Sequence, residues 1–262
     1  MSVTSELILF SKKDQVAYLT LNRAPANAYN NDFMSAFYQA VTQVNSDKSV
    51  NVIVLRSHSE KFFCAGADIK EFQQNDTSTN QLMVEKARAT MAAIEASDKI
   101  FIAEISGHTL GGGLEIALSC DLRFAAKGNY LLGLPEIKLG LIPGNGGSQR
   151  LTRLVGVSKA LEILATGEPF NVKQAFKMGL INQLISAESL SDEIHDYARK
   201  IAQGPSLAIS ATKKAVKLGS ELSLTQGLAL EKELSDSLYD TQDAFEGFNA
   251  FVEKRLAIFV GK

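Results

Sequence analysis

The chain has 262 residues, of which 45% are apolar and 21% are charged. This composition is typical of globular proteins and excludes a generally disordered chain, and the length suits one large domain or a domain with a smaller appendage. With 27 basic and 29 acidic side chains the formal charge is -2, which argues against a broadly basic surface of the kind that binds nucleic acids.

Cysteine usage and the lack of long apolar runs narrow the class further. Cys64 and Cys120 stand without a CxxC motif or a histidine at metal-ligand spacing, so we expect neither a disulfide framework nor a metal site. No apolar run approaches the about 20 residues of a membrane-spanning helix, and the segment MSVTSELILFSKKDQ lacks the regions of a signal peptide. We therefore expect a cytoplasmic protein that does not enter a membrane.

Three apolar runs rich in β-branched residues predict β-strands. They read VAYLTL at 16–21, VNVIVLR at 50–56 and KIFIAEI at 99–105, and turn-forming residues follow each of them. Helical spacing of apolar residues predicts helices at 32–44, after an Asn/Asp cluster that can cap it, and at 80–96. Strands that alternate with helices predict an α/β fold in which helices cover the sheet.

The composition changes near residue 204, beyond the glycine-rich middle of the chain. Helices are predicted in this part at 206–217, 223–238 and 241–259. We therefore expect an α/β core at 1–200 and a helical region at 201–262. The last predicted helix carries a strongly apolar face, which we expect to pack on the core or on another subunit.

Three successive glycines at 111–113 stand directly before an apolar run that predicts a helix. Glycine tolerates unusual backbone angles and allows close approach of a ligand. The first N–H groups of a helix have no helical partner and favour negative charge, so they suit a developing oxyanion. Glu115 falls in the first turn among apolar neighbours, where it either takes part in chemistry or caps its own helix.

A second carboxylate follows a proline in another glycine-rich segment. Pro135 fixes its own φ angle and restricts Leu134, so Glu136 is held in a defined direction. Taken alone, Glu136 is better interpreted as a solvated loop residue. Because Glu115 and Glu136 lie 21 positions apart in glycine-rich settings of one core, we predict an acid–base pair.

Small residues also follow the strand predicted at 50–56. The segment FCAGADIK at 63–70 permits close backbone approach, and Asp68 is placed to cap a following helix. A backbone N–H of this segment could meet one of the triple-glycine turn around a single oxygen, which would complete a site for an oxyanion.

These segments together resemble the enoyl-CoA hydratase/isomerase (crotonase) family. The resemblance rests on FCAGADIKE, GHTLGGGLEIALSCDLRFAA, GLPEIKLGLIPGNGGSQRLTRLVG, ALEILATGEPFNVKQAFKMGLIN and FVEKR, and it spans nearly the whole chain. It implies a spiral of ββα units followed by a C-terminal helical trimerisation region. It also implies that the N–H groups of Ala67 and Gly112 form an oxyanion hole and that Glu115 and Glu136 are the catalytic residues.

The resemblance further implies the activity of an enoyl-CoA hydratase, which adds water reversibly and syn to a 2-trans-enoyl-CoA. Glu115 would position the water and act as a base, and Glu136 would donate a proton. Coenzyme A is part of the substrate, and no other cofactor and no metal are expected. The implied assembly is a homotrimer or a dimer of trimers.

The implied coenzyme A site follows the segments 24–28 and 64–69. Its implied substrate-binding residues are Ala26, Ala28, Cys64, Ala65, Ala67, Asp68, Ile69, Gly111, Pro135 and Gly144. Phe251 and Lys254 are also implied to reach an acyl-CoA site, either of the same chain or of a neighbouring subunit. The alternatives for these two are a core aromatic residue and a solvated lysine.

Some positions depart from the commonest pattern of the family. Leu114 stands where cysteine or serine is frequent, Leu132 stands where phenylalanine is usual, and the loop at 22–30 is shorter than in most hydratases. These changes leave the acid pair in place and bear on the preference for acyl chains.

Other functions stay open. One well-placed glutamate suffices for a Δ3,Δ2-enoyl-CoA isomerase, and lyases or pathway-specific dehydratases of the family use the same residues. RNA binding, known in one branch of the family, would use Lys213, Lys214 and Lys217, which we instead expect on a solvated helix face. The intact acid pair argues against a catalytically inactive scaffold.

Overall fold

The computed structural model describes residues 5–262. The first four residues of the predicted core therefore lie outside the described chain, as does the start of the segment in which we expect no signal peptide. None of the helices within residues 5–262 is long and apolar enough to cross a membrane.

Two sheets organise the α/β part of the chain. The larger sheet has the order β1-β2-β3-β5-β7-β10, and its neighbouring strands are parallel except for β1 and β2. Its strands are β1 (Ile8–Lys13), β2 (Val16–Leu21), β3 (Val52–Ser57), β5 (Ile100–Ile105), β7 (Leu122–Ala126) and β10 (Gln183–Ile185). The smaller sheet has the order β4-β6-β8-β9. Its strands are β4 (Phe62–Cys64), β6 (His108–Leu110), β8 (Leu131–Gly133) and β9 (Phe170–Asn171).

Successive segments visit the large sheet, then the small sheet, then a helix. The helices that follow the small-sheet strands are α2 (Ile69–Gln74) and α3 (Thr77–Glu95) after β4, α4 (Gly112–Ser119) after β6, and η1 (Glu136–Leu139) and α5 (Gly147–Val155) after β8. This is the expected spiral of ββα units. Because β4, β6 and β8 lie side by side, the segments that leave them are brought together in space.

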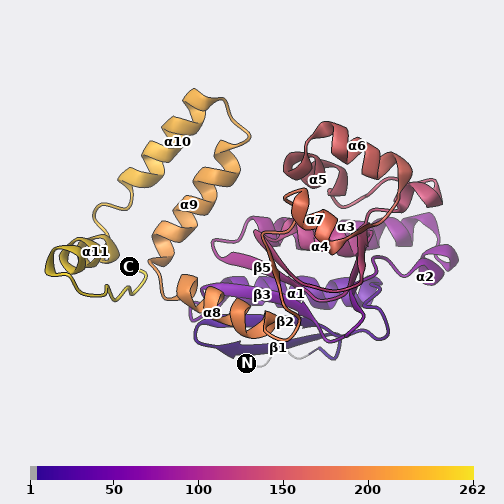
Figure 1. The fold of residues 1–262 in the computed structure, drawn as a ribbon, viewed down its shortest axis with the longest axis horizontal. Coiled ribbons are helices and arrows are strands. Elements are labelled where there is room, and N and C mark those ends of the chain that lie inside the picture. Colours follow the sequence, from indigo (N-terminus) through magenta and orange to yellow (C-terminus); the bar gives the residue numbers. More distant parts are fainter. Residues whose placement is uncertain (1–4) are drawn as a thin grey trace.

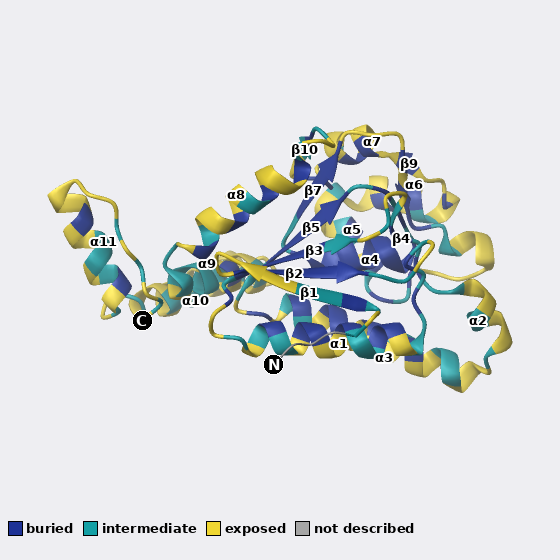
Figure 2. Ribbon diagram, turned by 90° about the horizontal axis from the view of Figure 1, so that it is seen from below, coloured by how far each residue is buried: buried dark blue, intermediate teal, exposed yellow. Residues whose placement is uncertain are grey.

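Helices cover both faces of the large sheet. The remaining helices of the α/β part are α1 (Asn31–Ser46), α6 (Val157–Thr166), α7 (Val172–Lys177) and α8 (Leu190–Ala202). Figure 2 shows α1 and α3 on one side of the sheet and α8 on the other. Every residue of β2 is buried, as expected for a strand covered on both faces.

The predicted strands and helices of the core are confirmed, with boundaries that differ by a few residues. β2 matches the strand predicted at 16–21, and β3 and β5 correspond to those predicted at 50–56 and 99–105. α1 and α3 correspond to the helices predicted at 32–44 and 80–96. The strands of the small sheet were not predicted, because they have three residues or fewer and show no readable periodicity.

The C-terminal helices α9 (Ser206–Gly219), α10 (Leu224–Asp236) and α11 (Gln242–Glu253) extend away from the core (Figure 1). The predicted helix at 241–259 is wrong beyond Glu253. Lys254 has a φ of 58°, which ends the helix in the left-handed region. The Ile258 N–H then donates to the Glu246 carboxylate at 2.8 Å, so the chain turns back along α11. The division at residue 200 stays a prediction.

The predicted solvated lysine face is wrong for Lys213, whose side chain is only 5% exposed. Its ammonium group donates to the Asp121 carboxylate at 2.9 Å and to the Lys99 carbonyl at 2.8 Å. Lys217 also pairs with Asp121, and Lys214 pairs with Asp98. Two aspartates thereby offset two of the three positive charges of the cluster, which argues against its use in RNA binding.

Lys213→Ala is expected to lower the free energy of unfolding by about 3 kcal/mol, because it leaves the buried Asp121 carboxylate without one of its cations. Denaturant unfolding measures this loss. In the control Lys214→Ala the lost pair is exposed, with side chains 47% and 67% accessible, so the expected loss is about 1 kcal/mol or less. Equal losses in the two variants would contradict the anchoring role of Lys213.

Candidate active site

A cavity of about 460 Å³ lies where the segments that leave β4, β6 and β8 meet. Most of its wall is apolar, and the larger apolar side chains are Ile69, Phe72, Met83, Val84, Leu139, Leu141 and Ile142. Its polar side chains include Tyr29, Glu115, Glu136 and Asn145. A concave apolar site with a few convergent polar groups is the usual form of a small-molecule site.

The backbone of two segments forms one end of this cavity. Tyr29 N–H donates to Gly66 O at 2.8 Å, and Asp68 N–H donates to Tyr29 O at 2.9 Å. These two hydrogen bonds pair Tyr29 with Ala67 as in a parallel sheet, so the N–H of Ala67 itself points away from Tyr29. Gly112 is the first residue of α4, so its N–H group has no acceptor within the helix.

Glycine is required for these segments to touch. Gly111 has a φ of +53°, which favours glycine. A Cβ on Gly112 would lie 1.9 Å from Tyr29 Oη, and one on Gly113 would lie 2.1 Å from Cys64 O. On the other segment, a Cβ on Gly66 would lie 3.0 Å from Gly112 N. The backbones of the two predicted oxyanion donors therefore meet at one place.

Glu115 projects from the first turn of α4 and is 1% exposed. Its Oε1 accepts the N–H groups of Asn145 at 2.7 Å and Gly147 at 2.8 Å, and its Oε2 accepts Asn145 Nδ2 at 2.9 Å. Glu115 thus binds the start of α5 and does not cap its own helix. Burial raises the pKa of this carboxyl above its usual range, and the hydrogen bonds from Gly147 and Asn145 offset only part of that rise.

Glu136 begins η1 directly after Pro135, and its carboxyl faces the same cavity. Oε2 of Glu136 is buried and has no hydrogen-bond partner among the described residues. Burial raises the pKa of Glu136 to about 7, and the charge of Glu115 raises it too. The interpretation as a solvated loop glutamate is therefore wrong. Near neutral pH a large fraction of Glu136 carries a proton.

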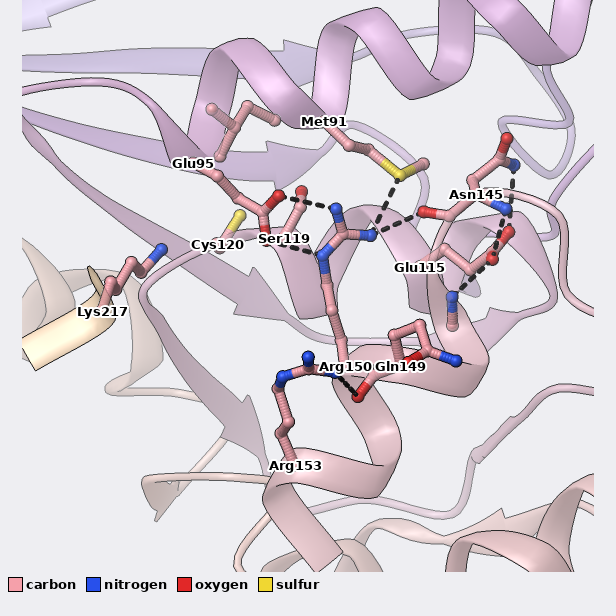
Figure 3. A network of polar contacts seen from close by, with 12 residues as sticks. Met91, Glu95, Glu115, Ser119, Cys120, Asn145, Gln149, Arg150, Arg153 and Lys217 are labelled. Atoms are coloured by element: carbon pink, nitrogen blue, oxygen red, sulfur yellow. Dashed lines mark hydrogen bonds and ion pairs between the residues drawn. The ribbon is translucent and has the colours of Figure 1, made fainter. Parts of the chain in front are cut away.

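An ion pair behind the cavity holds the segment that binds Glu115 (Figure 3). Arg150 Nη1 donates to the Asn145 carbonyl at 2.6 Å, and the same guanidinium binds both carboxylate oxygens of Glu95 at 2.6 and 2.7 Å. Because Glu95 lies on α3 and Arg150 on α5, two helices set the position of Asn145.

The structure places most of the predicted binding residues along the cavity or an adjoining hollow. Those that line the cavity are Ala65, Ala67, Ile69, Gly111, Pro135 and Gly144. The hollow shares part of this wall, and its predicted residues are Ala26, Ala28, Ala65, Ala67, Asp68 and Ile69. Asp68 caps α2 as predicted, and its carboxylate also binds Arg23 at 2.9 Å. Their contact with a ligand stays a prediction.

Three predicted residues lie elsewhere. Cys64 is 0% exposed and lines neither hollow, because its thiol faces the backbone of Asn27 at 3.0 Å. Its side chain packs in the core, and a part in substrate binding stays a prediction for this residue. Phe251 lies on α11, at the opposite end of the molecule from α2, and Lys254 follows it (Figure 1). Their predicted role can only concern a neighbouring subunit.

Sequence reasoning missed the residues that surround Glu115. Tyr29 and Asn145 line the cavity, and Gly147 supplies one of the N–H donors. The signals were the tyrosine in the loop NRAPANAYN and the polar side chain inside PGNGG. Neither pattern shows by itself that the two segments meet.

A cavity lined by the two predicted N–H donors, Ala67 and Gly112, and by two unequal carboxyl groups suits one class of enzyme. Such a site can bind a carbonyl oxygen that becomes an oxyanion, and it can move protons at the adjacent carbons.

Comparisons with known proteins identify the family. A sequence model described as enoyl-CoA hydratase/isomerase matches residues 11–262. The chain is 37% identical over 258 residues to a protein of Syntrophomonas wolfei named crotonyl-CoA hydratase, covering 98% of this chain and 99% of that protein. It is 40% identical over 248 residues to a probable mitochondrial enoyl-CoA hydratase of Dictyostelium discoideum, covering 93% of this chain and 87% of that protein.

A solved structure agrees with these matches. The enoyl-CoA hydratase of Bacillus anthracis superposes with a TM-score of 0.95 at 35% identity, over 98% of this chain and 100% of that one. The chain belongs to the enoyl-CoA hydratase/isomerase family, and the predicted family and fold class are confirmed.

Glu136→Gln is expected to change the pH dependence of stability. The pKa of Glu136 is raised from 4.5 to about 7 in the folded chain. Protonated Glu136 therefore contributes to the stability of the fold below about pH 4.5, and this contribution is lost as pH rises through about 7. The free energy of unfolding of the variant should therefore rise relative to that of the wild type between about pH 5 and about pH 8. The exposed Glu231→Gln is the control, and an equal pH response in both variants would contradict the raised pKa.

Proposed function

We propose that this chain is an enoyl-CoA hydratase, which adds water reversibly to a 2-trans-enoyl-CoA and forms a 3-hydroxyacyl-CoA. The observation that carries the proposal is the pair of carboxyl groups in one cavity, of which Glu115 is held by three donated hydrogen bonds and Glu136 has a buried oxygen without a described partner. Relatives of similar length that carry hydratase names support it.

The proposed reaction begins at the thioester carbonyl. Its oxygen lies between the N–H groups of Ala67 and Gly112, and these donors stabilise the negative charge that forms when the C2=C3 bond is attacked. Loss of one such donor typically costs about 3–4 kcal/mol of transition-state stabilisation. The two donors therefore activate the double bond toward water at C3.

The two glutamates then handle the water and its protons. Glu115 orients the water and takes one proton as the oxygen bonds to C3, while protonated Glu136 gives its proton to C2. The product gains one hydrogen and one hydroxyl, and return of the proton from Glu115 to Glu136 restores the starting state. The raised pKa of Glu136 keeps a large fraction of it protonated near neutral pH, and the hydrogen bonds that Glu115 accepts offset part of the rise that burial causes in its own pKa.

Each proposed step uses only the thioester, water and protons, so we propose no cofactor besides the coenzyme A of the substrate. The coenzyme A part would follow the hollow formed by the loops at 23–28 and 65–70. The cytoplasm stays the proposed compartment. Because several relatives are named as mitochondrial, cell fractionation tests it.

Hydration of crotonyl-CoA, followed as loss of absorbance of the conjugated thioester, tests the proposed function. Glu115→Gln and Glu136→Gln should each lower kcat by about 100- to 10,000-fold, the usual contribution of a general acid or base. Exposed Glu231→Gln is the matched control and should keep wild-type turnover.

A second outcome favours the isomerase. The Glu136 oxygen that has no partner among residues 5–262 could move a proton between C2 and C4 without help from Glu115. Isomerisation of a 3-enoyl-CoA by a wild type that does not hydrate crotonyl-CoA would replace the hydratase proposal. Activity on neither thioester would contradict both.

We also propose that the chain assembles as a homotrimer or a dimer of trimers through its C-terminal helices. Exposed apolar side chains gather in this region, and they are Phe245, Phe248, Phe251, Val252, Leu256 and Ile258. A surface of this kind usually packs against a partner. In the assembly, Phe251 and Lys254 would reach the acyl-CoA site of a neighbouring subunit.

Sedimentation velocity tests the assembly. The wild type should sediment with three or six times the mass of one chain. Phe251 and Leu256 are 86% and 91% exposed, and Phe251→Glu and Leu256→Glu should each give smaller species because they would bury a charge at the interface. Tyr38→Glu, on α1 and also exposed, should leave the mass unchanged. A monomeric wild type would contradict the proposal.

A further inference from the structure

Tyr29 is a buried tyrosine inside the cavity that the proposed mechanism does not yet use. It is 3% exposed and lines the cavity beside both glutamates. Its Oη lies 1.9 Å from the place where a Cβ on Gly112 would stand, so the hydroxyl borders the start of α4. Burial, followed by the charges of Glu115, Cys64 and Glu136, raises the pKa of Tyr29, so its hydroxyl keeps its proton.

Asn145 joins this hydroxyl to Glu115. The two hydrogens of Asn145 Nδ2 are directed to Tyr29 Oη at 3.1 Å and to Glu115 Oε2 at 2.9 Å. An ionised carboxylate only accepts hydrogen bonds, so the nitrogen of the amide must face Glu115. Tyr29 Oη is then an acceptor from Asn145, and its own O–H proton points elsewhere.

The O–H proton of Tyr29 has no acceptor among the described residues, for Asn145 Nδ2 is its one recorded hydrogen-bond partner there. Two oxygens that border the same cavity are also buried without a partner in the described chain, Asn145 Oδ1 and Glu136 Oε2. The amide oxygen of Asn145 only accepts, whereas Glu136 accepts when ionised and can donate when protonated. Buried polar groups are normally satisfied, so these groups beside a single cavity suit a small ligand that both donates and accepts, as a water or hydroxyl does.

We propose that Tyr29 and Asn145 place the oxygen that is added to the acyl chain: Tyr29 donates its O–H hydrogen bond to that oxygen, and Asn145 holds Glu115 beside it. The proposal rests on the hydratase function. Tyr29 thereby becomes a catalytic residue that contacts the reacting water, or the 3-hydroxyl group in the reverse direction. Asn145 becomes a positioning residue that acts through Glu115.

Tyr29→Phe removes the hydroxyl and keeps the ring. We expect kcat for hydration of crotonyl-CoA to fall about 10- to 100-fold, because one donor to the attacking oxygen is lost. The dissociation constant of butyryl-CoA, a saturated thioester with no oxygen at C3, should stay within about twofold of wild type, because a contact with the added oxygen is absent from that complex. Calorimetric titration measures this constant.

Asn145→Ala keeps the backbone N–H that binds Glu115 Oε1 and removes only the side-chain donor. The lost hydrogen bond favoured the ionised carboxylate, so the pKa of Glu115 should rise, and the acidic limb of the pH profile of kcat/KM should move to higher pH. Asn145→Asp, which replaces the donor by a second carboxylate, should impair hydration more than Asn145→Ala. A purely structural role would lower activity without moving this limb.

Tyr130→Phe is the matched control. Tyr130 is also a buried tyrosine, but its hydroxyl donates to the backbone carbonyls of Ile105 and Ala126 and does not line the cavity. We expect its hydration kinetics to match the wild type. Thermal melts of each variant separate loss of folding from loss of function, and Tyr29→Phe is read beside Asn145→Ala so that failure of one variant to fold leaves the other decisive.

The outcomes separate the two proposals. Wild-type hydration in Tyr29→Phe would overturn the inference and leave the hydratase function standing. Equal weakening of hydration and of butyryl-CoA binding would place Tyr29 at the thioester oxygen and would also overturn it. A wild type that binds butyryl-CoA but hydrates no enoyl-CoA would refute the function and the inference with it.

Discussion

The close packing of the start of α4 against Tyr29 and Cys64 is the constraint on which the site depends. The backbone at Gly112 and Gly113 lies so close to Tyr29 Oη and Cys64 O that a Cβ at either glycine would collide with them. This contact brings the first N–H groups of α4 to the cavity beside Ala67, and it aims Glu115 into the same space. A larger residue would move α4 outward and separate the donors from the carboxylate.

A second consequence of this packing is that the two carboxyl groups differ. Glu115 lies against the start of α5 and receives hydrogen bonds from Asn145 and Gly147, whereas Glu136 keeps a buried oxygen without a described partner. An acid and a base that work at one pH need environments that separate their pKa values. The ion pair between Arg150 and Glu95 maintains this difference from behind, because it holds Asn145 in place.

The chain has two regions, one that forms the cavity and one that presents an apolar surface. The spiral of strands and helices encloses the cavity, while α9 is tied to the spiral by the buried pair of Lys213 and Asp121. Beyond this anchor, α10 and α11 keep much apolar surface exposed. The anchor sets the direction in which this surface is presented, so the proposed assembly and the proposed chemistry rely on the same core.

The sequence by itself determined β2, β3 and β5, the helices α1 and α3, the glycine-rich turns and the two glutamates, since periodicity and small residues are properties of neighbouring positions. It did not determine the short strands of the second sheet, the end of α11, the burial of Lys213 or the surroundings of Glu115. Tyr29 and Asn145 are 116 positions apart, and Lys213 and Asp121 are 92 apart. Only the tertiary structure decided these features, because each depends on a contact between segments that local pattern does not join.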